Sequence, residues 1–343
     1  MSPALRSRPL SGALLAGTAI ALAVGLGIGL GPTTVPIWGA VASILDRLPL
    51  IDLDPGLTAT QEAILWELRL PRTVLGMLVG GLLAIAGGAY QGVFRNPLAD
   101  PYLLGVAAGA GLAATIGITT GLATAGTLPV WAFVGALGGV ALTYALGASV
   151  SRGQSTTVLI LAGVAVASFL TAVQTFVQQR NAETLREVYS WILGRLTTVG
   201  WDEVVTLLPY AAVSSVGLIV MRRLLDVLGV GDDEATALGV PVARVRITVL
   251  VLASLGTAAA VAASGLIAFV GLVVPHGVRL LAGSSYRVIL PLSLAFGGAF
   301  LVFADLLART LVAPSELPIG VVTAFFGAPF FALILRSAGA ARA

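Results

Sequence analysis

The densest group of ionisable side chains in the sequence is the run Asp232, Asp233 and Glu234, which lies between two glycines and between long apolar runs. Three adjacent carboxylates cannot lie in lipid. Acids in the first turn of a helix complement the positive end of the helix dipole. The pattern therefore predicts a short surface helix over 232–239, and a solvated loop between two spans is the alternative.

Other chemically active groups are scarce. The sequence has no cysteine and no lysine, so all 19 basic residues are arginine, and His276 is the single histidine. A conventional ATPase needs the lysine of a Walker A loop, and a zinc site needs several thiolate or imidazole ligands. The residues present exclude both. We interpret His276, which follows Pro275 in an apolar stretch, as structural.

The remaining acids lie almost entirely outside the long apolar runs, with Asp305 as the main exception. Arg309 follows it by four residues, which predicts an ion pair along one helix face. An ion-coupled secondary transporter would place carboxylates at mid-membrane. A membrane enzyme would need a nucleophile or metal cluster, and we find none. Any transport by this chain is therefore expected to draw its energy from another protein.

The composition predicts an all-α, polytopic membrane protein. The chain has 343 residues, of which 57% are hydrophobic and only 10% charged. Apolar runs of about 20 residues recur throughout, so we expect a single transmembrane domain over 1–343. We interpret the net charge of +3 as a consequence of how charged residues are distributed on the two sides of the membrane, and nucleic-acid binding is not expected. Ten approximate spans are predicted, at 10–30, 73–94, 102–120, 128–150, 158–178, 204–221, 245–263, 266–283, 288–308 and 319–336.

The boundaries of these spans depend on a few local signals. Ser264 and Gly265 divide a run that is too long for one span. Thr58 and Gln61 form a capping-box pattern, which predicts a short external helix that ends near Arg69. A second external helix is expected to end at the motif WILG.

The distribution of charge predicts the topology. Two arginines precede the first apolar run, which lacks a clear cleavage site, so we interpret it as a retained span and not as a signal peptide. Ten spans then place both termini in the cytoplasm. Most arginines fall on that side and most acids on the other, as the positive-inside rule requires.

Two stretches carry a family resemblance. The first begins at Arg69 and reads RLPRTVLGMLVGGLLAIAGGAYQGVFRNPLADPYLLGVAAGA, and the second, from Gly231, reads GDDEATALGV. Both resemble the BtuC/FecCD family of ABC-importer permeases, which take up cobalamin, haem and ferric siderophores. The resemblance covers nearly the whole chain from Arg69 onward. It implies a BtuC-like type II importer fold with about ten transmembrane helices.

The resemblance also implies partners. In this family two permeases pair with two ATPase subunits, and a binding protein delivers substrate from outside. ATP and magnesium would bind only in the ATPase, so no cofactor is expected in this chain. A homodimer is expected, and a heterodimer with a sister permease remains open. The helix at 232–239 would dock on the ATPase through Asp232, Asp233, Glu234, Ala235, Thr236, Leu238 and Gly239.

Two further sites follow from the same resemblance. Docking of the binding protein would use Arg69, Arg72 and Arg309, since arginine grips carboxylates in a bidentate manner. Interfacial snorkelling of these arginines is the alternative. A cytoplasmic gate would include Asn96, Leu98, Thr156 and Thr157, which as residue types also favour turns and helix caps.

The resemblance implies several possible cargoes. A ferric siderophore is expected because it is the commonest cargo of the family, with haem or cobalamin as alternatives. Arg195, in the segment WILGRL, departs from the small residue expected in many siderophore permeases. The expected location is the bacterial cytoplasmic membrane.

Overall fold

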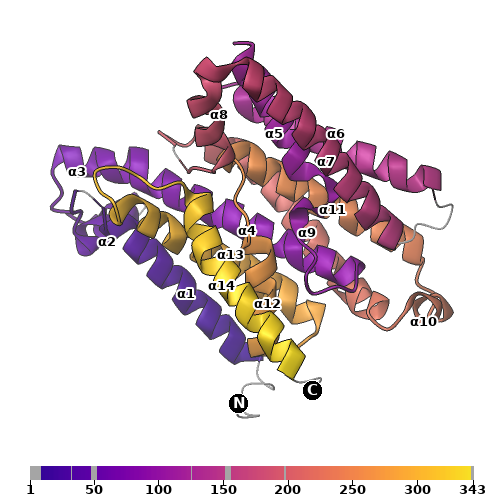
Figure 1. Cartoon of the computed structure of the whole chain (residues 1–343). Helices are drawn as coiled ribbons and strands as arrows, with labels where there is room; N and C mark the ends of the chain where they lie inside the picture. The colour runs from indigo at the N-terminus through magenta and orange to yellow at the C-terminus, as the bar shows by residue number, and fades with distance from the viewer. Residues whose placement is uncertain are drawn as a thin grey trace.

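The computed structural model describes residues 9–31, 33–47, 52–124, 126–150, 156–196 and 198–340, and most of these are helical. Figure 1 shows long helices that lie side by side. Their bounds are α1 Pro9–Gly29, α4 Leu70–Val93, α5 Val106–Thr119, α6 Leu128–Val150, α7 Thr156–Arg180, α9 Asp202–Leu228, α11 Val242–Ser264, α12 Val270–Ala282, α13 Tyr286–Thr310 and α14 Ile319–Ala340. The predicted all-α class is confirmed.

Short helical elements lie at the two ends of this bundle. They are α2 Ile37–Asp46, α3 Ala59–Ala63, the π-helix η2 Ile64–Arg69, the 3-10 turns η3 Pro101–Leu104 and η4 Ala182–Thr184, α8 Leu185–Ile192 and α10 Asp232–Ala237. In Figure 1, α2, α3 and α8 lie toward one end of the long helices. The helix α10, the start of α1 and the end of α14 lie toward the other end.

Among the described residues, seven helices are long and apolar enough to cross a membrane: α1, the stretch Ala59–Val93, α6, α7, α9, α11 and α13. The three other predicted spans fall on the shorter apolar helices α5, α12 and α14. The multi-pass class is therefore confirmed, and the count of ten spans stays a prediction.

The helix α4 is the centre of the bundle. It packs against α9, α11, α12 and α13, and most of its residues are buried. Glycines allow this close packing: Gly80 lies against the backbone of Gly297 in α13, and Gly87 lies against the carbonyl of Gly271 in α12. Small residues let helix backbones approach closely in membranes, so these contacts set the positions of the surrounding helices.

The segment before α4 differs from the prediction. The capping box of Thr58 and Gln61 is confirmed at the start of α3. The expected short helix does not end near Arg69, however, but continues through η2 into α4. Pro71 has no backbone N–H, and the wider π-helical turn just before it takes up this interruption of the hydrogen-bond ladder. The helix that contains the second predicted span therefore begins well before residue 73.

The predicted break at Ser264 and Gly265 is confirmed as a break between two helices, although the second helix begins later than the predicted residue 266. The helix α11 ends at Ser264, and Gly265 has a positive φ of 71°. The chain resumes helix at Val270. The loop after α8 satisfies backbone groups beside this break, because the amide of Arg195 donates to the carbonyl of Ser264 at 2.7 Å. The helix at WILG is confirmed as α8, which ends at Ile192.

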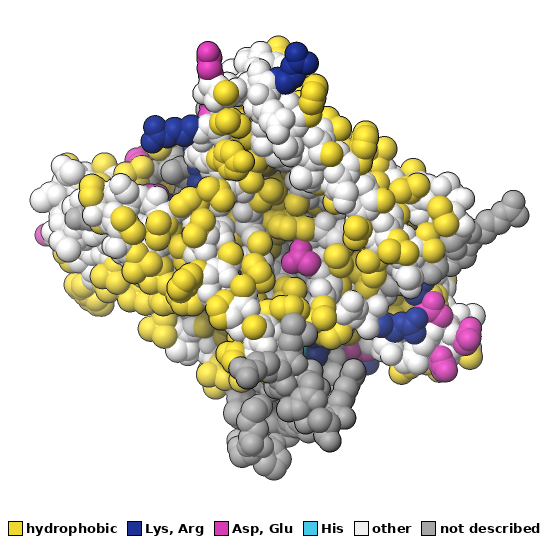
Figure 2. All heavy atoms as spheres, in the orientation of Figure 1, with side chains coloured by type: hydrophobic (Ala, Val, Ile, Leu, Met, Phe, Trp, Pro, Cys, Tyr) yellow, Lys and Arg dark blue, Asp and Glu magenta, His cyan; other side chains and the backbone are white. Residues whose placement is uncertain are grey.

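The face of the bundle seen in Figure 2 is mostly apolar, and many of its charged side chains gather toward the ends of the helices. Exposed side chains on the long helices include Phe169 and Phe176 of α7 and Phe325 of α14. A soluble protein rarely exposes a continuous apolar surface of this kind. The surface suits lipid and partner helices.

Candidate functional site

The sequence between α9 and α11 folds as predicted, into the short surface helix α10. The helix covers Asp232–Ala237, with Gly231 before it at a φ of 137°. Leu238 and Gly239, which were predicted as part of the helix, form the turn that ends it, and the amide of Gly239 donates to the carbonyl of Thr236 at 2.9 Å. The alternative, a solvated loop between two spans, is wrong for residues 232–237, which are helical.

The predicted coupling residues do not share one face of α10. Ala235 is fully buried against the bundle, and Asp232 is half-buried. The other five are exposed: Asp233, Glu234, Thr236, Leu238 and Gly239. A partner can reach the exposed group, whereas Asp232 and Ala235 hold the helix in place.

Asp232 binds two arginines that were not among the predicted site residues. Arg246 of α11 donates to both carboxylate oxygens, at 3.0 and 2.9 Å. Arg95, at the end of α4, lies 3.2 Å from the same carboxylate. The spacing between residues 95 and 232 gives no sign of this contact.

The proposed gate residues lie at the ends of α4 and α7. The side chain of Asn96 accepts a hydrogen bond from the amide of Leu98 at 2.9 Å, which forms a tight Asx turn. Leu98 is 39% exposed, and Thr157 is exposed in the first turn of α7. The side chain of Thr156 lies outside the described residues. The structure brings α7 against η3, where Gly163 meets the carbonyl of Leu103.

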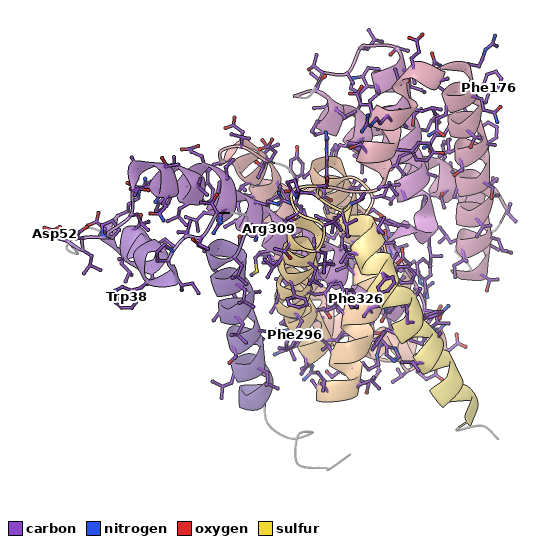
Figure 3. The ribbon with its side chains drawn as sticks, turned by 60° about the vertical axis from the view of Figure 1, so that its left-hand side comes forward. Trp38, Asp52, Phe176, Phe296, Arg309 and Phe326 are labelled. Atoms are coloured by element: carbon purple, nitrogen blue, oxygen red, sulfur yellow. The ribbon has the colours of Figure 1, made fainter. Side chains whose placement is uncertain are left out.

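Arg69 and Arg309 point inward. Arg69 donates to the carbonyl of Ile28 at 2.5 Å and of Gly29 at 3.0 Å, and it also reaches the carbonyl of Thr33. Arg309 donates to the carbonyl of Gly27 at 2.6 Å. Figure 3 shows Arg309 at the end of α1. Both arginines are buried, so they hold the end of α1 in this structure and do not present exposed guanidinium groups.

Arg72 joins two carboxylates. It contacts Asp305 of α13 at 2.8 to 3.1 Å and Glu316 of the following loop at 2.9 and 3.0 Å. These hydrogen bonds hold the pKa of Glu316 below its usual value. The predicted pair of Asp305 and Arg309 is confirmed at 3.5 Å. The contact between Arg72 and Asp305 has no signal in the sequence, because 233 residues separate them.

The described residues contain no group of three or more His, Cys, Asp or Glu side chains that could hold a metal ion. His276 packs its ring edge-on against Phe330 of α14, at a centroid distance of 6.4 Å. This contact agrees with the structural role that was expected for it.

An apolar helical bundle with a short acidic surface helix at one end is the architecture of a multi-pass membrane protein. Residues 18–337 match the FecCD transport family, and the chain belongs to that family. The predicted family resemblance is thus confirmed, and members of this family leave ATP hydrolysis to partner subunits.

Two relatives and one solved structure show the extent of the similarity. The chain is 45% identical over 276 residues to the uncharacterized ABC transporter permease protein YvrB of Bacillus subtilis (strain 168), across 79% of this chain and 78% of YvrB. It is 43% identical over 282 residues to the cobalamin import system permease protein BtuC of Halobacterium salinarum, across 82% of this chain and 75% of BtuC. A metal-chelate type ABC transporter in an inward-facing conformation matches with a TM-score of 0.82 and 27% identity, across 94% of this chain and 98% of that one.

Proposed function

We propose that this chain is the permease subunit of an ATP-driven importer that receives a ferric siderophore from a binding protein and moves it across the bacterial cytoplasmic membrane. Two copies of the chain would pair with two ATPase subunits. Each copy would have ten spans and both termini in the cytoplasm. The observation that carries the proposal is α10, a surface helix with an exposed acidic face between two long apolar helices.

In this proposal α10 is the contact for the ATPase. Closure of the ATPase dimer would push on α10 and tilt the spans between outward-open and inward-open states, as a two-state mechanical change. The exposed residues of α10 and its final turn would form the contact, and Leu238 is the largest apolar side chain among them, with 69% of its surface exposed. A partner cleft that covers Leu238 would remove this apolar side chain from water, which would stabilise the contact.

Leu238→Asp is therefore expected to weaken copurification of the ATPase by tenfold or more, because a buried apolar contact becomes an unpaired charge. The measurement is the amount of ATPase retained on the tagged permease. Leu122→Asp is the matched control, since Leu122 is 65% exposed in the loop between α5 and α6. If both variants retain the same amount of ATPase, α10 is not part of the contact with the ATPase.

Docking of the binding protein is proposed at the opposite end of the bundle. Among the three predicted arginines, Arg72 lies nearest the surface, with 14% of its side chain exposed beside Glu316 at 45%. Carboxylates of a docking protein would compete with Glu316 for Arg72. The burial of Arg69 and Arg309 supports a structural role for these two residues.

The cytoplasmic gate is proposed at Asn96, Leu98, Thr156 and Thr157. Leu98→Ala is expected to raise passive leak of cargo from liposomes several-fold, because it shortens an exposed apolar side chain at the turn that would narrow the path. The measurement is efflux from loaded proteoliposomes without ATP. Leu142→Ala, at an exposed leucine of α6, is the control that should not leak. Equal efflux from the two variants would argue for simple turn formation at Asn96.

Cobalamin is a second candidate cargo because BtuC of Halobacterium salinarum, whose name states cobalamin import, is 43% identical to this chain. Haem remains a third. The metal-chelate description of the matching solved structure supports a chelate more broadly. If the cargo is haem or cobalamin, the proposed architecture and the kinds of partner stay the same.

The experiment that tests the proposal is ATP hydrolysis in nanodiscs. The permease is copurified with the ATPase and binding protein encoded beside it, and ferric siderophore, haem or cobalamin is added in turn. Stimulation by one loaded binding protein establishes the importer and names its cargo. Uptake that is driven by an ion gradient without any ATPase would instead support secondary transport.

A further inference from the structure

The carboxylate of Asp232 joins three elements at one end of the bundle. It starts α10, accepts two hydrogen bonds from Arg246 of α11, and lies 3.2 Å from Arg95 at the end of α4. The side chain of Arg246 is only 6% exposed, whereas those of Arg95 and Asp232 are 43% and 42% exposed. Arg246 therefore fixes the orientation of the carboxylate within the fold, and Arg95 binds it at the surface.

Arg95 is part of the same turn as the proposed gate. It has a positive φ of 49°, where the chain leaves α4 and reverses. The next residue, Asn96, donates its amide to the carbonyl of Gln91 at 3.1 Å and accepts from the amide of Leu98. These bonds hold Asn96 against α4 and Leu98 against Asn96, so residues 95–98 form one compact turn.

The chain turns on both sides of α10. Glycines with positive φ, Gly231 and Gly239, lie on either side of it. Its packing contacts are with α9 and α11. In the part of the chain that the structure describes, the pair of Arg95 and Asp232 is the ion pair that connects α10 to the end of α4.

We propose that Arg95 and Asp232 are positioning residues, whose ion pair makes α10 and the turn at Asn96–Leu98 move together. Arg246 holds Asp232 in the orientation that Arg95 requires. The inference rests on the proposed function, since it takes α10 as the ATPase contact and the turn as the gate. An exposed ion pair contributes little to stability, so its loss is expected to change coupling more than folding.

The first test measures cargo transported and ATP hydrolysed in the same proteoliposomes, which contain the permease with its ATPase and binding protein. Arg95→Gln is expected to lower the ratio of transport to hydrolysis at least threefold. Arg95→Lys keeps the charge and is expected to restore more than half of the ratio. Arg287→Gln is the matched control, because Arg287 pairs with Asp226 at 3.5 Å and does not bind α10.

The second test measures the proposed linkage directly in the permease. Because the chain has no cysteine, spin labels at Leu98→Cys and Ala237→Cys are the two labels of each copy, and both positions are exposed. Dilution of the labelled permease with an excess of unlabelled permease restricts the measurement to the one distance within a copy. One narrow distance distribution is expected with Arg95 present, and a broader one with Arg95→Gln. An unchanged distribution together with an unchanged transport ratio would overturn the inference.

The two tests also separate this inference from the function on which it rests. If the permease with Arg95 intact shows no ATPase-dependent transport, the proposed function fails. The label distances, measured on the permease alone, still decide whether Arg95 holds α10 to the turn.

Discussion

Gly87→Ala is expected to prevent the chain from forming a stable bundle. Gly87 lies in the middle of α4, and a methyl group at this position would overlap the carbonyl of Gly271 in α12. Backbone atoms of two packed helices cannot move aside as a flexible side chain can, so the helices must separate. We expect a loss of about 3 kcal/mol or more. The measurement is thermal unfolding in detergent, together with the yield of monodisperse protein.

Gly138→Ala is the matched control for this experiment. Gly138 lies in α6, and no atom of another helix lies within 4 Å of the place where a methyl group would project. Alanine is also the better helix former, so the Tm is expected to stay the same or to rise slightly. If the two variants unfold at the same temperature, the contact between α4 and α12 does not determine the packing of the bundle.

Local signals were sufficient for much of the fold. Runs of apolar residues predict spans because every backbone group in lipid must be satisfied within its own helix. The capping box at Thr58 and the break at Gly265 are likewise encoded by adjacent residues, and both are confirmed. The helix α10 was predicted from its acids and flanking glycines, with an end that is two residues too long.

Contacts between distant residues could not be predicted in this way. The union of η2 with α4 was missed because Pro71 is a typical helix start, and only the π-helical turn before it lets the helix continue. The burial of Arg69 was missed because its partners are the carbonyls at the end of α1, which carry no side-chain signal. The sequence therefore indicates where arginines lie along the chain, but it does not indicate which groups they bind.

The same limit applies to α10. Three adjacent acids look equivalent in the sequence, and yet Asp232 faces the arginines of the bundle while Asp233 and Glu234 remain exposed. The rotation of a six-residue helix decides this, and the burial of Ala235 sets that rotation. The structure thus assigns different tasks to neighbouring carboxylates: one holds the helix to the bundle, and two are accessible to a partner.

Asp305→Asn is expected to have the second large effect. The side chain of Asp305 is 4% exposed and compensates both Arg72 and Arg309. The side chain of Arg309 is 7% exposed. When Asp305 is neutral, the carbonyl of Gly27 still accepts a hydrogen bond from Arg309, but no carboxylate compensates its charge. Removing one partner of a buried ion pair costs about 3–5 kcal/mol, because the remaining charge is uncompensated. The measurement is the Tm in detergent at pH 7.

Glu316→Gln is the control, because it neutralises the second carboxylate that binds Arg72. Glu316 is 45% exposed, so water replaces part of the lost interaction, and a loss below about 1 kcal/mol is expected. Arg72 lowers the pKa of Glu316 in the folded state. The stabilisation by the pair of Glu316 and Arg72 is therefore present above the unfolded-state pKa of Glu316 and is lost as the pH falls through its folded-state pKa. The Tm difference from wild type should therefore shrink below about pH 4.3. A larger loss for Glu316→Gln than for Asp305→Asn would show that the exposed carboxylate, and not the buried one, stabilises Arg72.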